Sequence, residues 1–362
     1  MKKIVFVIEE LSTGGAERVT AALANSFASS FGYDVSVIAR SESKNDYVLN
    51  QSVKKYIMPR SKYGRAGTII YKYSWIRRTI NSIGADYVIS LAIPKTVIML
   101  TFFSALKKYK LILSERNDPA LFPKGALIRK LRNWTYLSCD KVVFQTYDAQ
   151  EFFSEKIQKK SCVIPNPISD NLPERFQGQR SKRIVNFCRF EPQKNLEMLI
   201  KAFHKISNEF YDFELHLYGS GSEETKLKKL TTDLNLENKI VFHDFSTRVH
   251  EEINDCSLYV STSNYEGISN SMLEALAMGV PTICTDCPAG GARMMIKNGK
   301  NGLLIPVGDV DYLAKAMKRV LSDQQFSNMI SENAYKIRNS LNVLSISQQW
   351  LENMGENAYE QD

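Results

Sequence analysis

The stretch KIVFVIEELSTGGAERVTAALANS, residues 3–26, decides the fold. It opens with a short run of Ile, Val and Phe, which is typical of a buried parallel strand. A Gly-rich turn follows, and helical periodicity then extends from Ala16 to Ser30. A strand, a tight turn and a helix form the unit from which doubly wound α/β sheets are built.

The rest of the chain repeats this unit. The apolar runs are KIVFVI, VSVIA, YVISLA, LILSE, KVVFQT and CVIP in the first half, and RIVNF, ELHLYG, KIVFH, SLYVST, TICTD and LLIPV in the second. Residues 164–182 carry three prolines and little periodicity. We therefore predict an α/β protein with two doubly wound Rossmann-like domains that face each other across a cleft. The domains span residues 1–165 and 183–362, residues 166–182 form the linker, and the last helix can pack back on the first domain.

The composition, with 44% apolar and 24% charged residues, is that of a soluble globular protein. The six cysteines lack the spacing of a disulfide framework, and IVFVI near the N-terminus runs directly into Glu9 and Glu10. We therefore expect a cytoplasmic protein without a signal peptide. The most apolar stretch, Thr96 to Leu106, is about half the ~20 residues that a membrane-spanning helix needs.

The two halves differ in charge. The net charge is +13 up to Pro165 and −5 from Asn166 onward, so only the first half is expected to face an anionic partner. Three clusters there mix cations with Tyr or Trp, namely RSKYGR from Arg60, YKYSWIRR from Tyr71 and RKLRNW from Arg129. Such clusters predict peripheral docking on the anionic inner face of the cell membrane. A solvated basic face is the alternative, and no recognised motif indicates nucleic acid.

Ligand chemistry in this fold lies on loops that follow strands. The first such loop contains Gly14 and Gly15, which let the backbone approach a ligand or simply make a tight turn. In the second half, Arg189 and Lys194 lie five positions apart around Pro192. A guanidinium and an ammonium that converge suit a diphosphate, and two solvated surface charges are the alternative.

The stretch NYEGISNSMLEALAMGVP, residues 264–281, places Glu266 in a loop and Glu274 on the helix that follows. Free N–H groups at the helix start would face a phosphate, and the carboxylates would accept hydrogen bonds from a polyhydroxylated ligand. Alternatively, Glu274 is a surface residue and Glu266 an ordinary loop acid.

A fourth loop, LSERNDP at residues 113–119, follows a strand of the basic half. Arg116 and Asn117 would point from it into the cleft. Loop capping by Asn117 or Asp118 is the alternative.

Three other patterns are weaker. CTDC, residues 284–287, lacks a second pair or a nearby histidine that would complete a zinc site, so we predict a structural role. In DVD, residues 309–311, Asp309 precedes an apparent helix and is expected to be its N-cap rather than a metal ligand. GSGSEE, residues 219–224, is too short for a dinucleotide fingerprint and is expected to shape the floor of the site.

The set GGAER, RFEPQKN and EGISNSMLEALAMGVP resembles the retaining glycosyltransferases of family 4, which have the GT-B architecture. The resemblance extends from the first strand to GLLIPVGD, residues 302–309, and includes that family's two glutamates separated by seven residues. It implies that the second domain binds a nucleotide-sugar donor and the first binds the acceptor.

The resemblance also implies roles for single residues. Arg189 and Lys194 would hold the diphosphate, Glu274 the ribose and Glu266 the hexose. Further residues expected on the donor side are Gly15, Ile268, Ser269, Asn270 and Ser271, and those on the acceptor side are Gly14 and Asn117. Many members have a histidine where this chain has Arg116, and Arg116 is predicted to be among the catalytic residues without a role assigned to it in place of that histidine.

We therefore predict a retaining transferase that moves a hexose or N-acetylhexosamine from a UDP-linked donor to a hydroxyl of a lipid-linked or oligosaccharide acceptor. Cations and a helix start would stabilise the leaving diphosphate, so no metal or other cofactor is expected. A nucleotide-sugar 2-epimerase on the same architecture and a non-catalytic nucleotide-sugar binding module are the alternatives. Free sugar formed without acceptor would indicate the epimerase, and binding without turnover the module.

Overall fold

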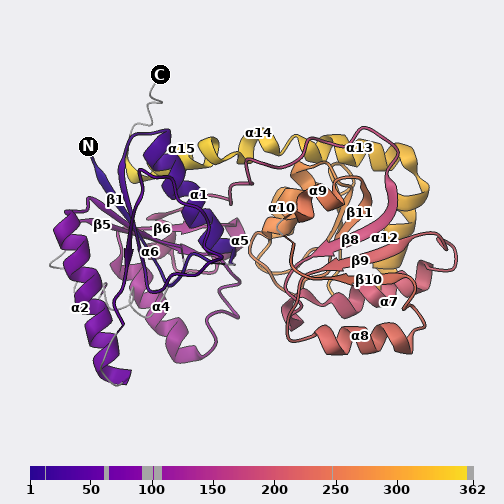
Figure 1. The fold of residues 1–362 in the computed structure, drawn as a ribbon, viewed down its shortest axis with the longest axis horizontal. Coiled ribbons are helices and arrows are strands. Elements are labelled where there is room, and N and C mark those ends of the chain that lie inside the picture. Colours follow the sequence, from indigo (N-terminus) through magenta and orange to yellow (C-terminus); the bar gives the residue numbers. More distant parts are fainter. Residues whose placement is uncertain (13, 61–64, 92–100, 102–107, 247, 357–362) are drawn as a thin grey trace. The chain divides into compact units, whose positions relative to one another are not determined.

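The computed structural model describes residues 1–12, 14–60, 65–91, 101, 108–246 and 248–356. It divides into two compact units, Met1–Pro167 with Val343–Asp362, and Ile168–Asn342. Each unit contains a parallel β-sheet with helices, so the predicted α/β class is confirmed (Figure 1). From Ile168 on, the segment predicted as a linker groups with the second unit, and the segment from Val343 groups with the first.

In the first unit the strands lie in the order β3-β2-β1-β4-β5-β6-β7. Their bounds are β1 Lys3–Ile8, β2 Asp34–Ala39, β3 Lys54–Ile57, β4 Tyr87–Ser90, β5 Lys110–Glu115, β6 Lys141–Phe144 and β7 Ser161–Val163. The helices are α1 Gly15–Ser29, α2 Arg65–Ile83, α4 Ala126–Ser138, α5 Tyr147–Glu151, α6 Glu155–Gln158 and α15 Val343–Met354. Helix α15 packs against α1 and buries Trp350 completely (Figure 1).

In the second unit the strands lie in the order β10-β9-β8-β11-β12-β13. Their bounds are β8 Ser181–Phe187, β9 Glu214–Tyr218, β10 Ile240–His243, β11 Cys256–Ser261, β12 Thr282–Thr285 and β13 Leu303–Ile305. The helices are α7 Leu196–Ile206, α8 Glu224–Asp233, α9 Val249–Ile253, α10 Asn270–Ala277, α11 Gly291–Met295, α12 Val310–Ser322, α13 Gln324–Tyr335 and α14 Arg338–Leu341, and a short 3-10 helix, η2, spans Pro192–Lys194.

The apolar runs at the centre of each sheet become strands that are covered on both faces. Residues 4–8 of β1 are at most 4% exposed, and Leu258, Tyr259 and Val260 of β11 are fully buried. Strand β3 was missed, because its sequence KKYI contains two lysines and it lies at the edge of its sheet.

The order of the strands reverses between β8 and β11. The chain builds β9 and β10 on one side of β8 and then returns to place β11 on the other. Loops that follow two such neighbouring strands leave the sheet in opposite directions, so ligands of doubly wound sheets bind there. In this unit those loops are residues 188–195 and 262–269, which contain the predicted donor residues Arg189, Lys194, Glu266, Ile268 and Ser269.

Arg132 of α4 corrects one prediction. It was assigned to the RKLRNW cluster that would face a membrane, but it is only 1% exposed. Its Nη1 lies 3.4 Å from a carboxylate oxygen of Glu115 and donates to the carbonyls of Pro119 and Phe122 at 2.8 and 2.6 Å. Arg132 thus holds the loop after β5, because it lies on the inner face of α4, whereas Lys130 on the same helix is exposed.

We predict that Arg132→Met lowers the free energy of unfolding by about 3–5 kcal/mol, because it leaves the buried Glu115 carboxylate without its counter-ion. Urea denaturation measures this change. The matched control is Arg129→Met on the same helix, where the expected loss is at most about 0.5 kcal/mol. Equal losses in the two variants would show that the Arg132 ion pair does not stabilise the unit.

Candidate active site

Two loops meet at the carboxyl edge of the second sheet. One follows β8 and ends in η2, and the other follows β11. Gln193 joins them, because its carbonyl accepts a hydrogen bond from the backbone N–H of Asn264 at 2.8 Å and its side chain donates to the carbonyl of Tyr265 at 2.9 Å. The two loops therefore form one surface.

Lys194 and Glu266 form an ion pair on this surface, although 72 residues separate them in the chain. Their side chains are 14% and 21% exposed, so both charges are largely removed from water. The hydroxyl of Ser263 donates to the same oxygen of Glu266 at 3.2 Å. Burial alone would lower the pKa of the Lys194 ammonium, but the Glu266 carboxylate raises it above its usual value. Lys194 is therefore charged at neutral pH.

Arg189 lies beside this pair. The Arg189 side chain is exposed. Its positive charge acts to lower the pKa of Lys194, so the two cations lie close together. Among the described residues, its side chain makes no hydrogen bond or ion pair. The structure thus brings together Arg189, Lys194 and Glu266, and it leaves one guanidinium available to an anion.

The backbone of Glu266 is held by the loop after β12. Its N–H donates to the carbonyl of Pro288 at 2.6 Å, and its carbonyl accepts from the N–H of Ala289 at 2.9 Å. Nearby, a Cβ added to Gly291 would lie 1.8 Å from the carbonyl oxygen of Gly267, so only glycine fits at the start of α11. These contacts fix the position of Glu266 before any ligand binds.

The predicted donor residues Ile268, Ser269, Asn270 and Ser271 form the start of α10. Ser269 is the N-cap, and its hydroxyl accepts from the N–H of Met272 at 3.5 Å. The hydroxyl of Ser271 accepts from the buried Tyr259 hydroxyl at 3.0 Å. The first turn of a helix directs N–H groups out of its end, and the partial positive charge there favours an anion.

Glu274 lies one turn into α10 and is only 6% exposed, so its interpretation as a surface residue is wrong. His250 of α9 contacts it, with Nε2 at 2.9 Å from a carboxylate oxygen. His250 was not predicted from the sequence, because no motif connects it with a glutamate 24 positions later. One oxygen of Glu274 is thus held by an imidazole, which orients the carboxylate.

A small hollow lies beside Glu266. Its lining residues include Ser261, Ser269, Cys284 and Cys287. Both thiols are buried, and burial raises the pKa of Cys287 to about 11 and that of Cys284 further. The CTDC thiols are therefore protonated at neutral pH, which makes them weak nucleophiles.

The two other weak sequence patterns, GSGSEE at residues 219–224 and DVD at residues 309–311, both belong to the second unit. Phe190, next to Arg189, donates its N–H to the carbonyl of Ser220 at 2.8 Å, so the GSGSEE loop packs directly under the Arg189 loop. Asp309 accepts from the N–H of Tyr312 at 2.8 Å and caps α12, so the predicted N-cap is confirmed.

The remaining predicted site residues belong to the first unit. Gly14 is the N-cap of α1 and Gly15 its first residue, while Thr13 of the same loop lies outside the described residues. The Oδ1 of Asn117 accepts from the N–H of Asp118 at 2.8 Å, so its side chain is turned toward its own loop. Arg116 donates through Nη1 to Oδ1 of Asn166 and lies 5.8 Å from the centre of the Trp350 ring.

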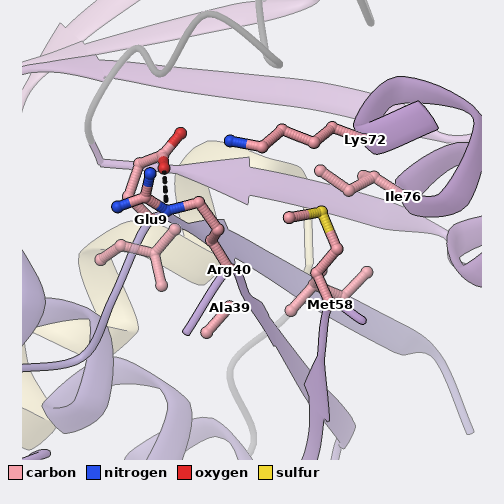
Figure 2. A pocket seen from close by; sticks show the side chains of 8 residues that line it. Glu9, Ala39, Arg40, Met58, Lys72 and Ile76 are labelled. Atoms are coloured by element: carbon pink, nitrogen blue, oxygen red, sulfur yellow. Dashed lines mark ion pairs between the residues drawn. The ribbon is translucent and has the colours of Figure 1, made fainter. Parts of the chain in front are cut away.

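The first unit also contains a small hollow at the carboxyl ends of β1 and β2. Its floor is apolar, and Figure 2 shows the Lys72 amine directed toward the ion pair of Glu9 and Arg40. Lys72 belongs to the YKYSWIRR cluster, which was predicted to face a membrane. Its half-buried side chain has no hydrogen bond or ion pair in the described part of the chain, so it adds a positive charge to this hollow.

The arrangement in the second unit is suited to binding rather than to covalent catalysis. It combines two cations and a helix start, which attract a phosphate, with two carboxylates, which accept hydrogen bonds from hydroxyls. The thiols are protonated and Glu266 is paired with Lys194. The best-matched ligand therefore carries both phosphates and sugar hydroxyls.

Comparison with known proteins agrees with this chemistry. Residues 13–172 match the model of glycosyltransferase family 4, and residues 170–337 match that of glycosyl transferases group 1. The chain is 25% identical to an uncharacterized glycosyltransferase of Haemophilus influenzae, with 97% of this chain and 99% of the relative covered. It is also 25% identical to an alpha-1,4-N-acetyl-D-galactosaminyltransferase of Campylobacter jejuni that acts on an undecaprenol-linked glycan, with 98% and 99% covered.

Among solved structures, HepE of Anabaena, crystallised with UDP and glucose, has a TM-score of 0.83 at 20% identity, with 98% of this chain and 100% of HepE covered. TarM of S. aureus has a TM-score of 0.81 at 16% identity, with 98% and 99% covered. These two likenesses show the shared GT-B fold. Because the two family models together match nearly the whole chain, the chain belongs to the family 4 glycosyltransferases.

Proposed function

We propose that this glycosyltransferase moves a hexose or N-acetylhexosamine from a UDP-linked donor to a hydroxyl of a lipid-linked or oligosaccharide acceptor, with retention at the anomeric carbon. The observation that carries the proposal is the Lys194–Glu266 ion pair beside Arg189. It presents cations for a diphosphate and a carboxylate for a sugar on one surface of the second unit.

The donor is assigned from the chemistry of this surface. Arg189 and Lys194 bind the diphosphate together with the start of α10, Glu266 binds hydroxyls of the hexose, and Glu274, oriented by His250, binds the ribose. The solved structure of HepE, which has the same fold, contains UDP and glucose, and this supports a uridine nucleotide.

Retention proceeds by attack from the front face. The acceptor oxygen forms a bond to the anomeric carbon on the side from which the diphosphate leaves, and the acceptor proton passes to the departing phosphate oxygen. The main task of the protein is then to stabilise the negative charge on the diphosphate. Lys194 and Arg189 supply the positive charge that stabilises the diphosphate, so the reaction needs no metal ion.

The acceptor is assigned to the first unit, which carries the positive net charge. The Campylobacter jejuni relative acts on an undecaprenol-linked glycan, and this supports a lipid-linked acceptor. Among the described residues, no helix has the length and apolar character to cross a membrane. We therefore propose that the first unit docks peripherally on the inner face of the cell membrane.

Helix α4 offers the docking surface that the structure describes best. Leu127 and Ile128 are 71% and 43% exposed and lie next to Arg129 and Lys130. Exposed apolar side chains beside cations suit the boundary between headgroups and acyl chains. Most of the RSKYGR cluster, residues 61–65, lies outside the side chains that the structure describes.

Glu266→Gln is expected to lower turnover at least about 100-fold without weakening UDP binding, because Glu266 binds the sugar and its loss of charge leaves Lys194 free for the diphosphate. Glu274→Gln is expected to weaken UDP binding by about 10–100-fold, the cost of a hydrogen bond to a charged group. Calorimetry with UDP and initial rates with the donor measure the two effects. Equal losses in both variants would refute the separate roles.

Activity is expected to survive EDTA, because side chains supply the positive charge that a metal would otherwise provide. The measurement is the initial rate after dialysis against EDTA, with and without added Mn²⁺ or Mg²⁺. A strict requirement for either ion would contradict the proposed stabilisation of the diphosphate.

Vesicle co-sedimentation is expected to show binding to anionic but not zwitterionic lipid, weakening as salt rises. Each cation at such a surface is worth about 1 kcal/mol, so replacing four should lower binding at least about tenfold. The variant changes to serine Arg77, Arg78, Arg129 and Lys130, and it spares the buried Arg132. Binding that ignores lipid charge would refute the docking surface.

The matched control removes four exposed lysines of the second unit by mutation to serine, namely Lys229, Lys297, Lys300 and Lys315. It lowers the net charge by the same amount, so it should leave vesicle binding largely unchanged if the first unit alone docks. Similar losses in both variants would indicate a general charge effect.

A further inference from the structure

Arg116, directly after β5, has a buried guanidinium that is only partly paired. Its Nη1 donates to Oδ1 of Asn166, but among the described residues its Nε and Nη2 have no hydrogen-bond partner, and both atoms are shielded from solvent. The neighbouring Glu115 carboxylate favours the charged form of Arg116, but its side chain pairs with Arg132 and Tyr136 and makes no hydrogen bond to the guanidinium. Burial lowers the pKa of Arg116 to about 9. A buried guanidinium with two unpaired nitrogens destabilises the folded protein when no ligand is bound.

The surrounding residues fix the guanidinium. Oδ1 of Asn166 also accepts from Nε2 of Gln145 at 2.6 Å, so the amide is held from a second side. The fully buried Trp350 ring lies 5.8 Å from the guanidinium carbon. One edge of Arg116 is thus anchored, and the Nε–Nη2 edge is left unpaired. This is an edge through which arginine binds two oxygens of one anion.

A second arginine approaches the same segment. Arg18 of α1 donates through Nη2 to the carbonyl of Pro167 at 3.2 Å, and Pro167 directly follows Asn166. Asn166 and Pro167 are consecutive, and their Cα atoms are therefore about 3.8 Å apart. The guanidinium groups of Arg116 and Arg18 thus bind neighbouring residues. The local positive charge therefore comes from two elements that are distant in sequence.

We propose that the Nε–Nη2 edge of Arg116 is a binding site for a phosphate group of the acceptor. The proposal rests on the proposed function, which assigns the donor diphosphate to Arg189 and Lys194 in the second unit and a lipid-linked acceptor to the first. A phosphate offers two oxygens to the unpaired edge and supplies the missing negative charge. Arg116 then selects acceptors that carry a phosphate, and it does not replace a catalytic histidine.

The test is calorimetric titration of the full-length protein with inorganic pyrophosphate and, separately, with UDP. Wild type is expected to bind pyrophosphate at a site that Arg116→Met removes, while the affinity of both proteins for UDP is the same within twofold. Arg116→Lys keeps the charge but loses the forked geometry, so it should weaken pyrophosphate binding at that site at least tenfold.

Arg40→Met is the matched control, because it removes a partly exposed arginine of the same unit that has no role in the proposed binding surfaces. It should leave the pyrophosphate isotherm unchanged. Identical isotherms for wild type, Arg116→Met and Arg116→Lys would overturn the proposal, and so would a loss of UDP binding in Arg116→Met, which would assign the edge to the donor. Failure of the proposed function is distinguishable, because wild type itself would then not bind UDP.

Discussion

The candidate active site depends on one interaction, the partly buried ion pair between Lys194 and Glu266. Two charges of this kind cost free energy when they leave water, and each offsets that cost for the other. The pair forms only because β8 and β11 are neighbours in the sheet while β9 and β10 separate them in the chain. The reversal of strand order therefore creates the site, and the ion pair and the backbone bonds between the loops hold it in place before the donor arrives.

In the unliganded protein the two groups satisfy each other. A diphosphate that approached Lys194 would compete with Glu266 for the ammonium, and the sugar hydroxyls would give Glu266 new partners. Binding of a complete nucleotide-sugar compensates both charges at once, whereas a phosphate alone compensates only one. The pair thus favours ligands that carry phosphate and sugar together, and Arg189, which has no partner in the described part of the chain, adds attraction for the diphosphate.

The sequence predicted those features that arise from local patterns. Runs of Val and Ile marked the central strands, and Asp309 marked the start of α12. Features that depend on tertiary packing were missed or wrong: β3 has too few apolar residues to stand out, and His250 meets Glu274 only in the folded unit. Arg132 was wrongly assigned to the surface, because a cluster of cations on a helix does not show which of them the fold turns inward to a carboxylate.

The most direct test of the central claim is a crystal structure of the protein with an intact, non-hydrolysable UDP-sugar. The account predicts that Arg189 and Lys194 contact the diphosphate, that a Glu266 oxygen accepts from a hydroxyl of the sugar, and that Glu274 accepts from the ribose while it keeps His250 as its neighbour. A nucleotide bound away from the carboxyl edge of β8 and β11, with the Lys194–Glu266 pair unchanged, would contradict it.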